Sequence, residues 1–169
     1  MKLKIILSFF LLVSSLNAYA DAEDYFKQST HEFGLSNIGF GYSTEGSFIV
    51  EASTRYQYYI RDRIAIGGAA FYSNFDSQEW MGIGPTASYI FWAHQNWFSR
   101  VDQFLTAAKY SGFSYDPSSI YGTTSIGINY LPTTSNFFIG VGYAHSYALD
   151  NREVLKPNAI QLLLGWLWI

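Results

Sequence analysis

The sequence contains no cysteine and little charge. The absence of cysteine among its 169 residues excludes disulfide bonds and thiol chemistry. Charged residues make up 14% of the chain, against about 25% in a typical soluble domain. Long hydrophobic runs are also missing, because no window offers the roughly 18 consecutive apolar residues that a membrane-spanning helix needs. If this chain crosses a membrane, it does not do so as a helix.

Aromatic residues, by contrast, are abundant. They account for 20% of the chain, yet the mean hydropathy is only +0.04 because small and polar residues fill the remaining positions. A soluble β-sandwich rarely combines so many aromatic residues with so little charge. A barrel with a lipid-facing outside and a polar interior does.

The first twenty residues have the organisation of a secretory signal peptide. Lys2 and Lys4 give a positive start, residues 5–13 are apolar, and Ala18-Tyr19-Ala20 fits the small-x-small cleavage rule. We therefore expect residues 1–20 to be removed. Without these two lysines the chain keeps 8 basic and 13 acidic residues, a net charge of −5, which argues against a nucleic-acid partner.

The stretch 48–60 alternates apolar and polar side chains along its whole length. One row runs from Phe48 to Ile60 and is mainly apolar, while the other row includes Glu51 and Arg55. A strict period of two indicates a β-strand. At about 3.4 Å per residue and a tilt of about 45°, this stretch rises roughly 30 Å, the thickness of a bilayer's hydrocarbon core. It therefore predicts a transmembrane strand.

Comparable alternation predicts further strands over 35–44, 64–73, 81–92, 120–130, 137–149 and 159–169. Pro85 lies within one of them, and because proline cannot donate a hydrogen bond to a neighbouring strand, it needs a bulge or a locally unpaired position.

The segment 97–113 is ambiguous. Its apolar residues recur at i, i+4, i+7, i+8 and i+11, which is the spacing of an amphipathic helix. Its length suits a strand, and without it seven strands would remain, an odd number that bacterial single-chain barrels do not use. We interpret it as a strand with a bulge near 100–103; a regular strand and a helix are the alternatives.

Eight strands predict an all-β fold, an eight-stranded antiparallel up-and-down transmembrane β-barrel over residues 35–169, preceded by a periplasmic N-terminal arm over 21–34. An even number of strands places both termini on one side, which after secretion is the periplasm. The predicted turns near Arg61, His94 and Pro132 would then face the periplasm, and the predicted loops near Glu45, Asp76, Asp116 and Asp150 the cell surface.

A signal peptide, eight amphipathic strands and a chain that finishes on its last strand resemble the small outer-membrane barrels of the OmpA and OmpX type. The resemblance is one of pattern over the mature chain, whose end, Gly165-Trp166-Leu167-Trp168-Ile169, departs from the terminal phenylalanine usual there. It implies location in a Gram-negative outer membrane, contact with outer-membrane lipid and insertion by the barrel-assembly machinery. We expect a monomer.

The interior of such a barrel is just wide enough for side chains. Glu51 and Arg55 are predicted to face it, as a gate or selectivity pair or as part of an ionic network that fills the space. Arg100, Asp102 and Lys109 are possible further members. Small residues on several inward rows leave a narrow conduit as an alternative, although Tyr59, Phe71, Trp92, Tyr121 and Phe138 are also predicted to point inward.

The outward rows place aromatic residues where the lipid headgroups would lie. The predicted aromatic girdle consists of Tyr56, Tyr58, Tyr72, Tyr89, Phe91, Tyr130, Tyr143, Tyr147, Trp166 and Trp168. His145 lies on an outward row near the predicted outer rim, where lipid A deacylase barrels carry a His-x-Ser pair. Here position 147 is Tyr and Ser146 points inward, so a serine nucleophile is missing.

No metal-binding spacing or phosphate-binding loop is present, so we expect no metal and no cofactor. The predicted function is a structural or surface-interaction role in the cell envelope, without catalysis. A passive channel for small solutes is the first alternative, and a lipid-modifying enzyme is the second.

Overall fold

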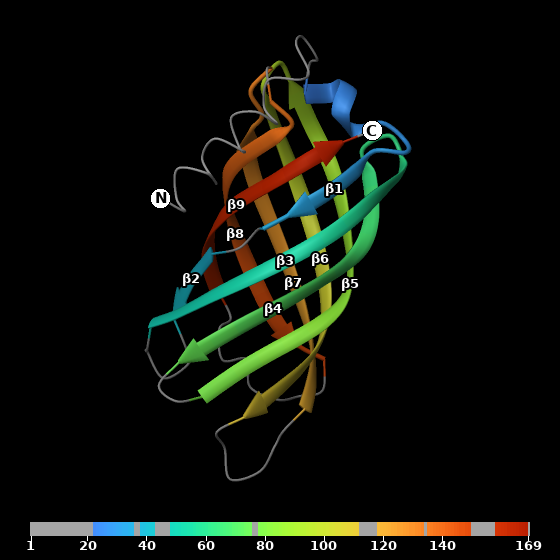
Figure 1. Ribbon diagram of the computed structural model, residues 1–169. Coiled ribbons are helices and arrows are strands. Elements are labelled where there is room, and N and C mark those ends of the chain that lie inside the picture. Colours follow the sequence, from blue (N-terminus) through green and yellow to red (C-terminus); the bar gives the residue numbers. More distant parts are fainter. Residues whose placement is uncertain are drawn as a thin grey trace, which may run out of the picture.

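The computed structural model describes residues 22–35, 38–42, 48–75, 78–111, 118–133, 135–149 and 158–168. The predicted signal peptide, the predicted turn at 45–46 and the predicted outer loops near residues 76, 116 and 150 lie outside this part of the chain. The described residues form one short 3-10 helix, η1 (Ala22–Phe26), and the strands β1 (His31–Gly34), β2 (Ile38–Tyr42), β3 (Phe48–Arg61), β4 (Ile64–Phe75), β5 (Gln78–His94), β6 (Trp97–Ser111), β7 (Ser118–Tyr130), β8 (Phe137–Ala148) and β9 (Asn158–Trp168) (Figure 1).

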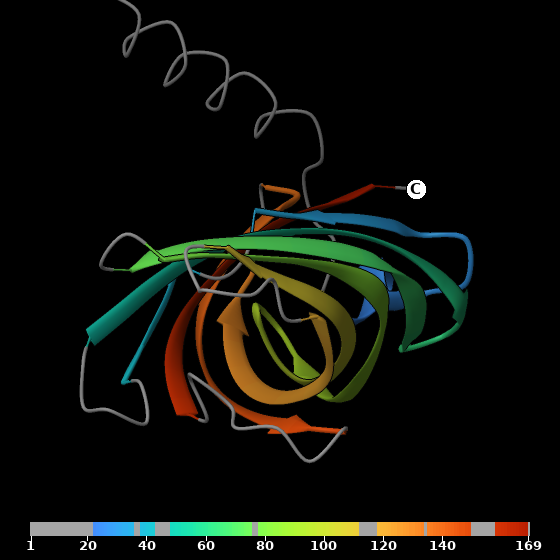
Figure 2. The ribbon, with the colours of Figure 1, turned by 90° about the horizontal axis from the view of Figure 1, so that it is seen from below.

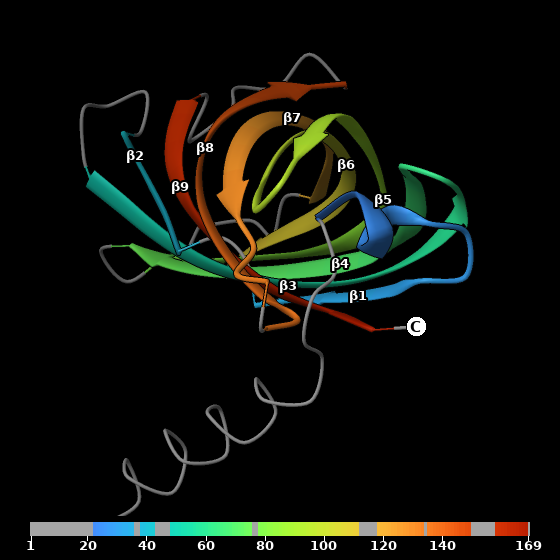
Figure 3. The ribbon, with the colours of Figure 1, turned by 90° about the horizontal axis from the view of Figure 1, so that it is seen from above.

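The strands form a single closed antiparallel sheet. β1 and β2 lie end to end between the same two strands, because both pair with β3 on one side and with β9 on the other. Together they occupy one position in the barrel, so the nine labelled strands fill eight positions. We call each of these positions a stave. The remaining strands pair in chain order from β3 to β9, and views from both ends show them curving around a common centre (Figure 2 and Figure 3). The predicted eight-stranded antiparallel barrel is confirmed.

The two faces of each stave differ as the alternation predicts. Along β8, Phe138, Ala144 and Ser146 are buried, whereas Val141 and Tyr143 are exposed. Large exposed apolar residues recur on the outside of the other strands too, and Ile83 reaches 69% exposure. A surface of this kind, too apolar for water, is typical of a barrel that faces lipid.

The first stave begins earlier than expected. Residues His31–Gly34, which the sequence assigns to the N-terminal arm, form β1 and pair with β3 and β9. Gly34 is opposite both Arg55 and Gly165, and the ladder resumes in β2. The boundary between arm and barrel therefore lies before His31.

The segment before β1 folds into the end of the barrel. Figure 1 shows η1 at the end where β9 finishes. The amide of Ala22 donates to the carbonyl oxygen of Gln95 at 2.7 Å, and the amide of Arg63 donates to that of Phe26 at 2.6 Å. Arg63 also forms an ion pair with Glu23. These bonds tie η1 to two inter-strand turns, so this part of the predicted arm is a cap on the barrel.

The segment 97–113 is a strand over 97–111, which confirms that interpretation against the helix. The predicted bulge near residues 100–103 is wrong in position. β6 pairs with β7 without interruption from Trp97 to Lys109, and the register shift lies in the neighbouring strand β5, between Ile90 and Trp92. The extra residue reverses the alternation there, so Trp92, predicted to point inward, is 43% exposed.

Pro85 has the locally unpaired position that its missing amide proton demands. It pairs with Gly68 on the β4 side. On the β6 side the ladder steps from Ile83–Ala107 to Thr86–Phe104, which leaves Gly84 and Pro85 without ladder partners there while the register is kept.

In the described residues, no helix has both the length and the apolar character needed to cross a bilayer.

Candidate functional site

Four charged side chains from three strands meet inside the barrel. Glu32 comes from β1, Arg55 from β3, and Arg100 and Asp102 from β6. Each faces inward because its neighbours along the strand, such as Phe33 and Val101, take the outward positions. Glu32 and Arg100 are completely buried, and Arg55 and Asp102 are each 6% exposed. We call these four residues the charged layer.

Every member of the charged layer contacts two members of opposite charge. Glu32 Oε1 accepts hydrogen bonds from Arg55 Nε at 3.0 Å and from Arg100 Nη1 at 2.8 Å. Asp102 Oδ1 accepts from Arg100 Nε at 2.8 Å and Nη2 at 2.6 Å. Asp102 Oδ2 lies 3.3 Å from Arg55 Nη1. Two cations and two anions therefore balance, which is the condition for keeping charges in a low-dielectric interior.

Neutral polar side chains complete the layer. Arg100 Nη2 donates to Gln57 Oε1 at 3.0 Å and to Ser88 Oγ at 2.7 Å, and Ser88 also donates to Asp102. The hydroxyl of Tyr59 donates to Glu32 Oε2 at 3.0 Å. Through these contacts the layer forms a cross-brace between β1, β3, β5 and β6.

An aromatic layer closes the barrel between the charged layer and η1. Phe26 of η1 is completely buried, with its ring centroid 4.6 Å from that of Phe98 and 5.8 Å from that of Tyr59. Phe138 packs edge-on against Phe98 at 5.3 Å. Ala22, Tyr25, Ala65, Ile90, Leu131 and Leu167 belong to the same cluster. The lumen at this end is filled with hydrocarbon.

Tyr25 anchors the cap at its rim. Its hydroxyl donates to Asn136 Oδ1 at 3.4 Å, across the mouth of the barrel. Burial raises the pKa of this hydroxyl, and the carboxylate of Asp24 adds to the effect. Tyr25 therefore remains a hydrogen-bond donor at neutral pH.

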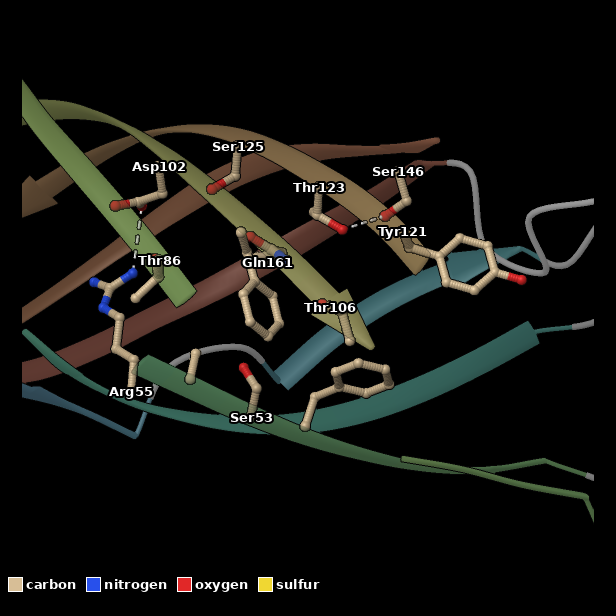
Figure 4. Close-up of a pocket in the computed structure, with 13 residues that line it drawn as sticks. Ser53, Arg55, Thr86, Asp102, Thr106, Tyr121, Thr123, Ser125, Ser146 and Gln161 are labelled. Atoms are coloured by element: carbon tan, nitrogen blue, oxygen red, sulfur yellow. Dashed lines mark hydrogen bonds and ion pairs between the residues drawn. The ribbon is translucent and has the colours of Figure 1, made fainter. Parts of the chain in front are cut away.

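A cavity of about 50 Å³ lies on the other side of the charged layer (Figure 4). A single water molecule needs about 10–15 Å³, so the cavity has room for a few. Arg55 and Asp102 border it at one end, and its walls carry Ser53, Thr86, Thr106, Thr123, Ser125, Ser146 and Gln161. Gln161 Oε1 is buried without a partner in the described part of the chain. Ala69, Phe71, Phe104 and Tyr121 also line the cavity, so its walls are partly polar and partly apolar.

The structure brings together some of the predicted interior residues and not others. Arg55, Arg100 and Asp102 lie in the charged layer, whereas Lys109 is exposed on the outside of β6. Arg55 contacts Glu32 and Asp102. Residues four apart on one strand are separated by about 13 Å, and the side chain of Glu51 lies outside the described residues.

Glu32 is the member of the charged layer that the sequence pattern did not predict, because its position falls in the predicted N-terminal arm. A weak signal was present, since Phe33 and Leu35 alternate with Glu32 and Gly34. Four residues of alternation are too few to define a strand without its partners.

All ten residues of the predicted aromatic girdle are exposed or half-buried. Near the end of the barrel that η1 caps, Trp168 stacks on the ring of His31, with centroids 5.8 Å apart, and His31 Nδ1 lies 2.5 Å from the hydroxyl of Tyr56. Tyr56 is 47% exposed, as a girdle residue would be. That these rings lie at a membrane interface remains a prediction.

His145 is exposed, and within the described part of the chain the contacts of its ring are with an amide and an aromatic ring. Its Nδ1 lies 3.1 Å from Asn158 Oδ1, and its ring stacks against Tyr147 with centroids 6.4 Å apart. Ser146 faces the interior, where its hydroxyl lies 2.8 Å from that of Thr123. Among the described residues, no group of three or more His, Asp or Glu is placed to hold a metal ion.

A closed eight-stave barrel with an apolar outside and a polar, filled interior belongs to the transmembrane type of β-barrel. Solved structures of outer-membrane barrels have a similar fold. The N-terminal β-barrel domain of OprF from Pseudomonas aeruginosa matches with a TM-score of 0.65 at 13% identity, over 83% of this chain and 98% of that domain. Neisserial surface protein A, NspA, matches with a TM-score of 0.61 at 15% identity, over 82% of this chain and 95% of that protein.

A de novo designed transmembrane β-barrel also matches, with a TM-score of 0.52 at 14% identity, over 84% of this chain and 97% of the design. No protein-family model and no curated protein sequence matches the chain. The chain therefore has the fold of the small eight-stranded outer-membrane barrels, as its sequence pattern predicts. At these identities the similarity concerns the fold alone.

Proposed function

We propose that this protein is a closed barrel of the Gram-negative outer membrane with a structural or surface-interaction role and no catalytic activity. The observation that carries the proposal is the double obstruction of the lumen. The charged layer fills one level with matched ion pairs, and the aromatic layer around Phe26 fills the next. A barrel obstructed in this way is suited to bracing the membrane or presenting its ends to a partner.

Both termini lie on the periplasmic side in this proposal. η1 then caps the periplasmic mouth, together with the turns at Arg63 and Gln95 to which it is hydrogen-bonded. The partners are outer-membrane lipid and the barrel-assembly machinery that inserts the chain, and the protein acts as a monomer. Cleavage of residues 1–20 precedes insertion.

The absence of cysteine allows a direct test of location and orientation, because single-cysteine variants carry one label each. Arg61→Cys lies beside an inter-strand turn at the capped end, and Ser118→Cys lies at the opposite end of the barrel, where β7 begins. In intact cells, a membrane-impermeant maleimide should label Ser118→Cys and should label Arg61→Cys only after the outer membrane is permeabilised. The reverse pattern would refute the orientation, and recovery of the protein in the soluble fraction would refute the membrane location.

A passive channel is the second candidate, and the cavity beside Arg55 and Asp102 favours it. Conduction through such a channel requires the charged layer and the aromatic layer to open. Steady conductance by the unmodified protein would select this candidate over the closed barrel.

A further inference from the structure

A row of polar side chains crosses the outside of the barrel. Gln103 of β6 is opposite Thr124 of β7, Thr124 is opposite His145 of β8, and His145 is opposite Asn158 of β9. Thr124, His145 and Asn158 are exposed and Gln103 is half-buried. We call these four residues the polar row. The polar row runs from Asn158 and His145, near the loop ends of β9 and β8, to Thr124 and Gln103 near the middle of their strands. There, a polar group that faces lipid is costly unless it is hydrogen-bonded.

Internal hydrogen bonds satisfy the polar row only in part. Thr124 Oγ1 donates to Gln103 Oε1 at 2.7 Å. Asn158 Oδ1 lies 3.1 Å from His145 Nδ1 and accepts from the hydroxyl of Tyr143 at 2.5 Å. Neither His145 Nε2 nor the side-chain nitrogen Nδ2 of Asn158 has a hydrogen-bond partner in the described part of the chain. These two nitrogens are available to a ligand on the outside of the barrel.

An apolar groove adjoins the polar row. On three strands its lining begins at the next outward position: Ile126 follows Thr124, Tyr143 precedes His145, and Ile160 follows Asn158. The groove has a volume of about 360 Å³ and is open to the outside, and its main side chains are Phe91, Ile126, Ile128, Val141, Tyr143 and Ile160.

We propose that the polar row and the groove together bind one membrane lipid, with an acyl chain in the groove and the ester, amide or hydroxyl groups of the lipid hydrogen-bonded to His145 and Asn158. This inference rests on the proposed function, because it needs the outside of the barrel to be in a membrane. A site that is polar at one end and apolar along its length fits an amphiphile. A wholly polar solute or a bare hydrocarbon would match only half of it.

The geometry also indicates which part of the lipid meets the polar row and which leaflet supplies it. Among the described residues, no Lys, Arg, Asp or Glu lines the groove or belongs to the polar row, so the groups that we assign to His145 and Asn158 are the neutral linkages between headgroup and chain. His145 and Asn158 lie closer to the loop ends of β8 and β9 than the groove does. With both termini in the periplasm, the polar end of the lipid points to the cell surface, as it does in the outer leaflet.

Photolabelling tests this assignment. The mature chain is reconstituted into nanodiscs of phosphatidylethanolamine and phosphatidylglycerol that contain a small fraction of phosphatidylethanolamine with a diazirine in its acyl chain. After irradiation, mass spectrometry maps the labelled residues. We expect labels to concentrate on Ile126, Val141 and Ile160 relative to Ile66 and Ile83, which are equally outward-facing on β4 and β5.

Variants separate binding from simple exposure to lipid. His145→Leu with Asn158→Leu should lower groove labelling by about tenfold, equivalent to about 1.4 kcal/mol, and leave Ile66 and Ile83 unchanged. Val141→Trp fills the groove without touching the polar row and should also lower labelling. Thr54→Val, which removes an outward hydroxyl on β3, is the matched control and should change nothing. Heat-modifiable migration on gels checks that each variant folds.

Three results would overturn the inference. They are equal labelling on all faces, groove labelling that survives the His145 and Asn158 substitutions, and crosslinks between two copies of the chain at the groove, which would make the occupant a protein. In each of these, labelling of Ile66 and Ile83 would still support a membrane-embedded barrel. Loss of labelling on every face would instead contradict the proposed function together with this inference.

Discussion

Arg100 Nη1 lies 2.8 Å from Glu32 Oε1 and 3.1 Å from Glu32 Oε2, although the two residues are 68 positions apart and both are completely buried. The contact crosses the lumen and joins β1 to β6. Glu32 also accepts hydrogen bonds from Arg55 and Tyr59, so its carboxylate holds three side chains of the ionic cross-brace.

Glu32→Ala should destabilise the barrel strongly. The substitution leaves Arg55 and Arg100 with Asp102 as their one carboxylate partner in the charged layer, and breaking a buried ion pair from one side costs about 3–5 kcal/mol. Urea unfolding of the protein in detergent micelles, followed by tryptophan fluorescence, measures the loss.

Glu32→Gln combined with Arg100→Met is the matched comparison, because it removes one charge of each sign and keeps similar volumes. This double variant should be more stable than Glu32→Ala, since Arg55 and Asp102 still balance each other. Equal loss in both variants would show that the ion pairing itself contributes little.

Phe26→Ala should loosen the cap. The ring is completely buried between Tyr59 and Phe98, and removing a buried phenylalanine ring costs about 3–5 kcal/mol. Phe33→Ala removes the same ring from an outward position that is 36% exposed and should cost less. Hydrogen exchange of the amides of Ala22 and Arg63, which are bonded to Gln95 and Phe26, reports whether the cap opens; unchanged protection in Phe26→Ala would contradict its role.

Two adjacent glycines should respond differently to the same substitution. A Cβ on Gly67 would lie 1.9 Å from the carbonyl oxygen of Tyr56, a backbone atom that cannot move without disturbing the β3–β4 ladder. A Cβ on Gly68 would meet only the carbonyl oxygen of Gly84, at 3.9 Å. Gly67→Ala should therefore cost about 1–3 kcal/mol and Gly68→Ala about 0.5 kcal/mol or less, measured by the same urea titration. Equal effects would mean that the two strands do not approach as closely as described.

The sequence predicted the barrel well because the alternation of side chains acts along single strands. The inward direction of Arg55 follows from this period, as does the outward direction of Tyr56. The sequence did not predict which inward residues meet, since cross-strand register depends on the closure of the whole sheet. Glu51 and Arg55 are close in sequence and can be considered together on one strand, whereas Glu32 and Arg100 meet only when the barrel closes.

One inserted residue was enough to invalidate a further prediction. The register shift between Ile90 and Trp92 leaves no mark in the sequence, yet it turns Trp92 from the inside to the outside. The cap was missed for a related reason: residues 22–30 have no period of their own, and their place depends on the aromatic side chains that the barrel gathers around Phe26.

Planar-bilayer conductance tests the central claim, that two successive layers close the lumen, most directly. The unmodified protein and the double variant Glu32→Gln with Arg100→Met should both show no steady unitary current, because the aromatic layer around Phe26 remains in place. If any of these proteins conducts, it should be the same double variant without residues 22–28, because that deletion also removes Phe26 from the aromatic layer. Steady unitary currents from the unmodified protein would contradict the account.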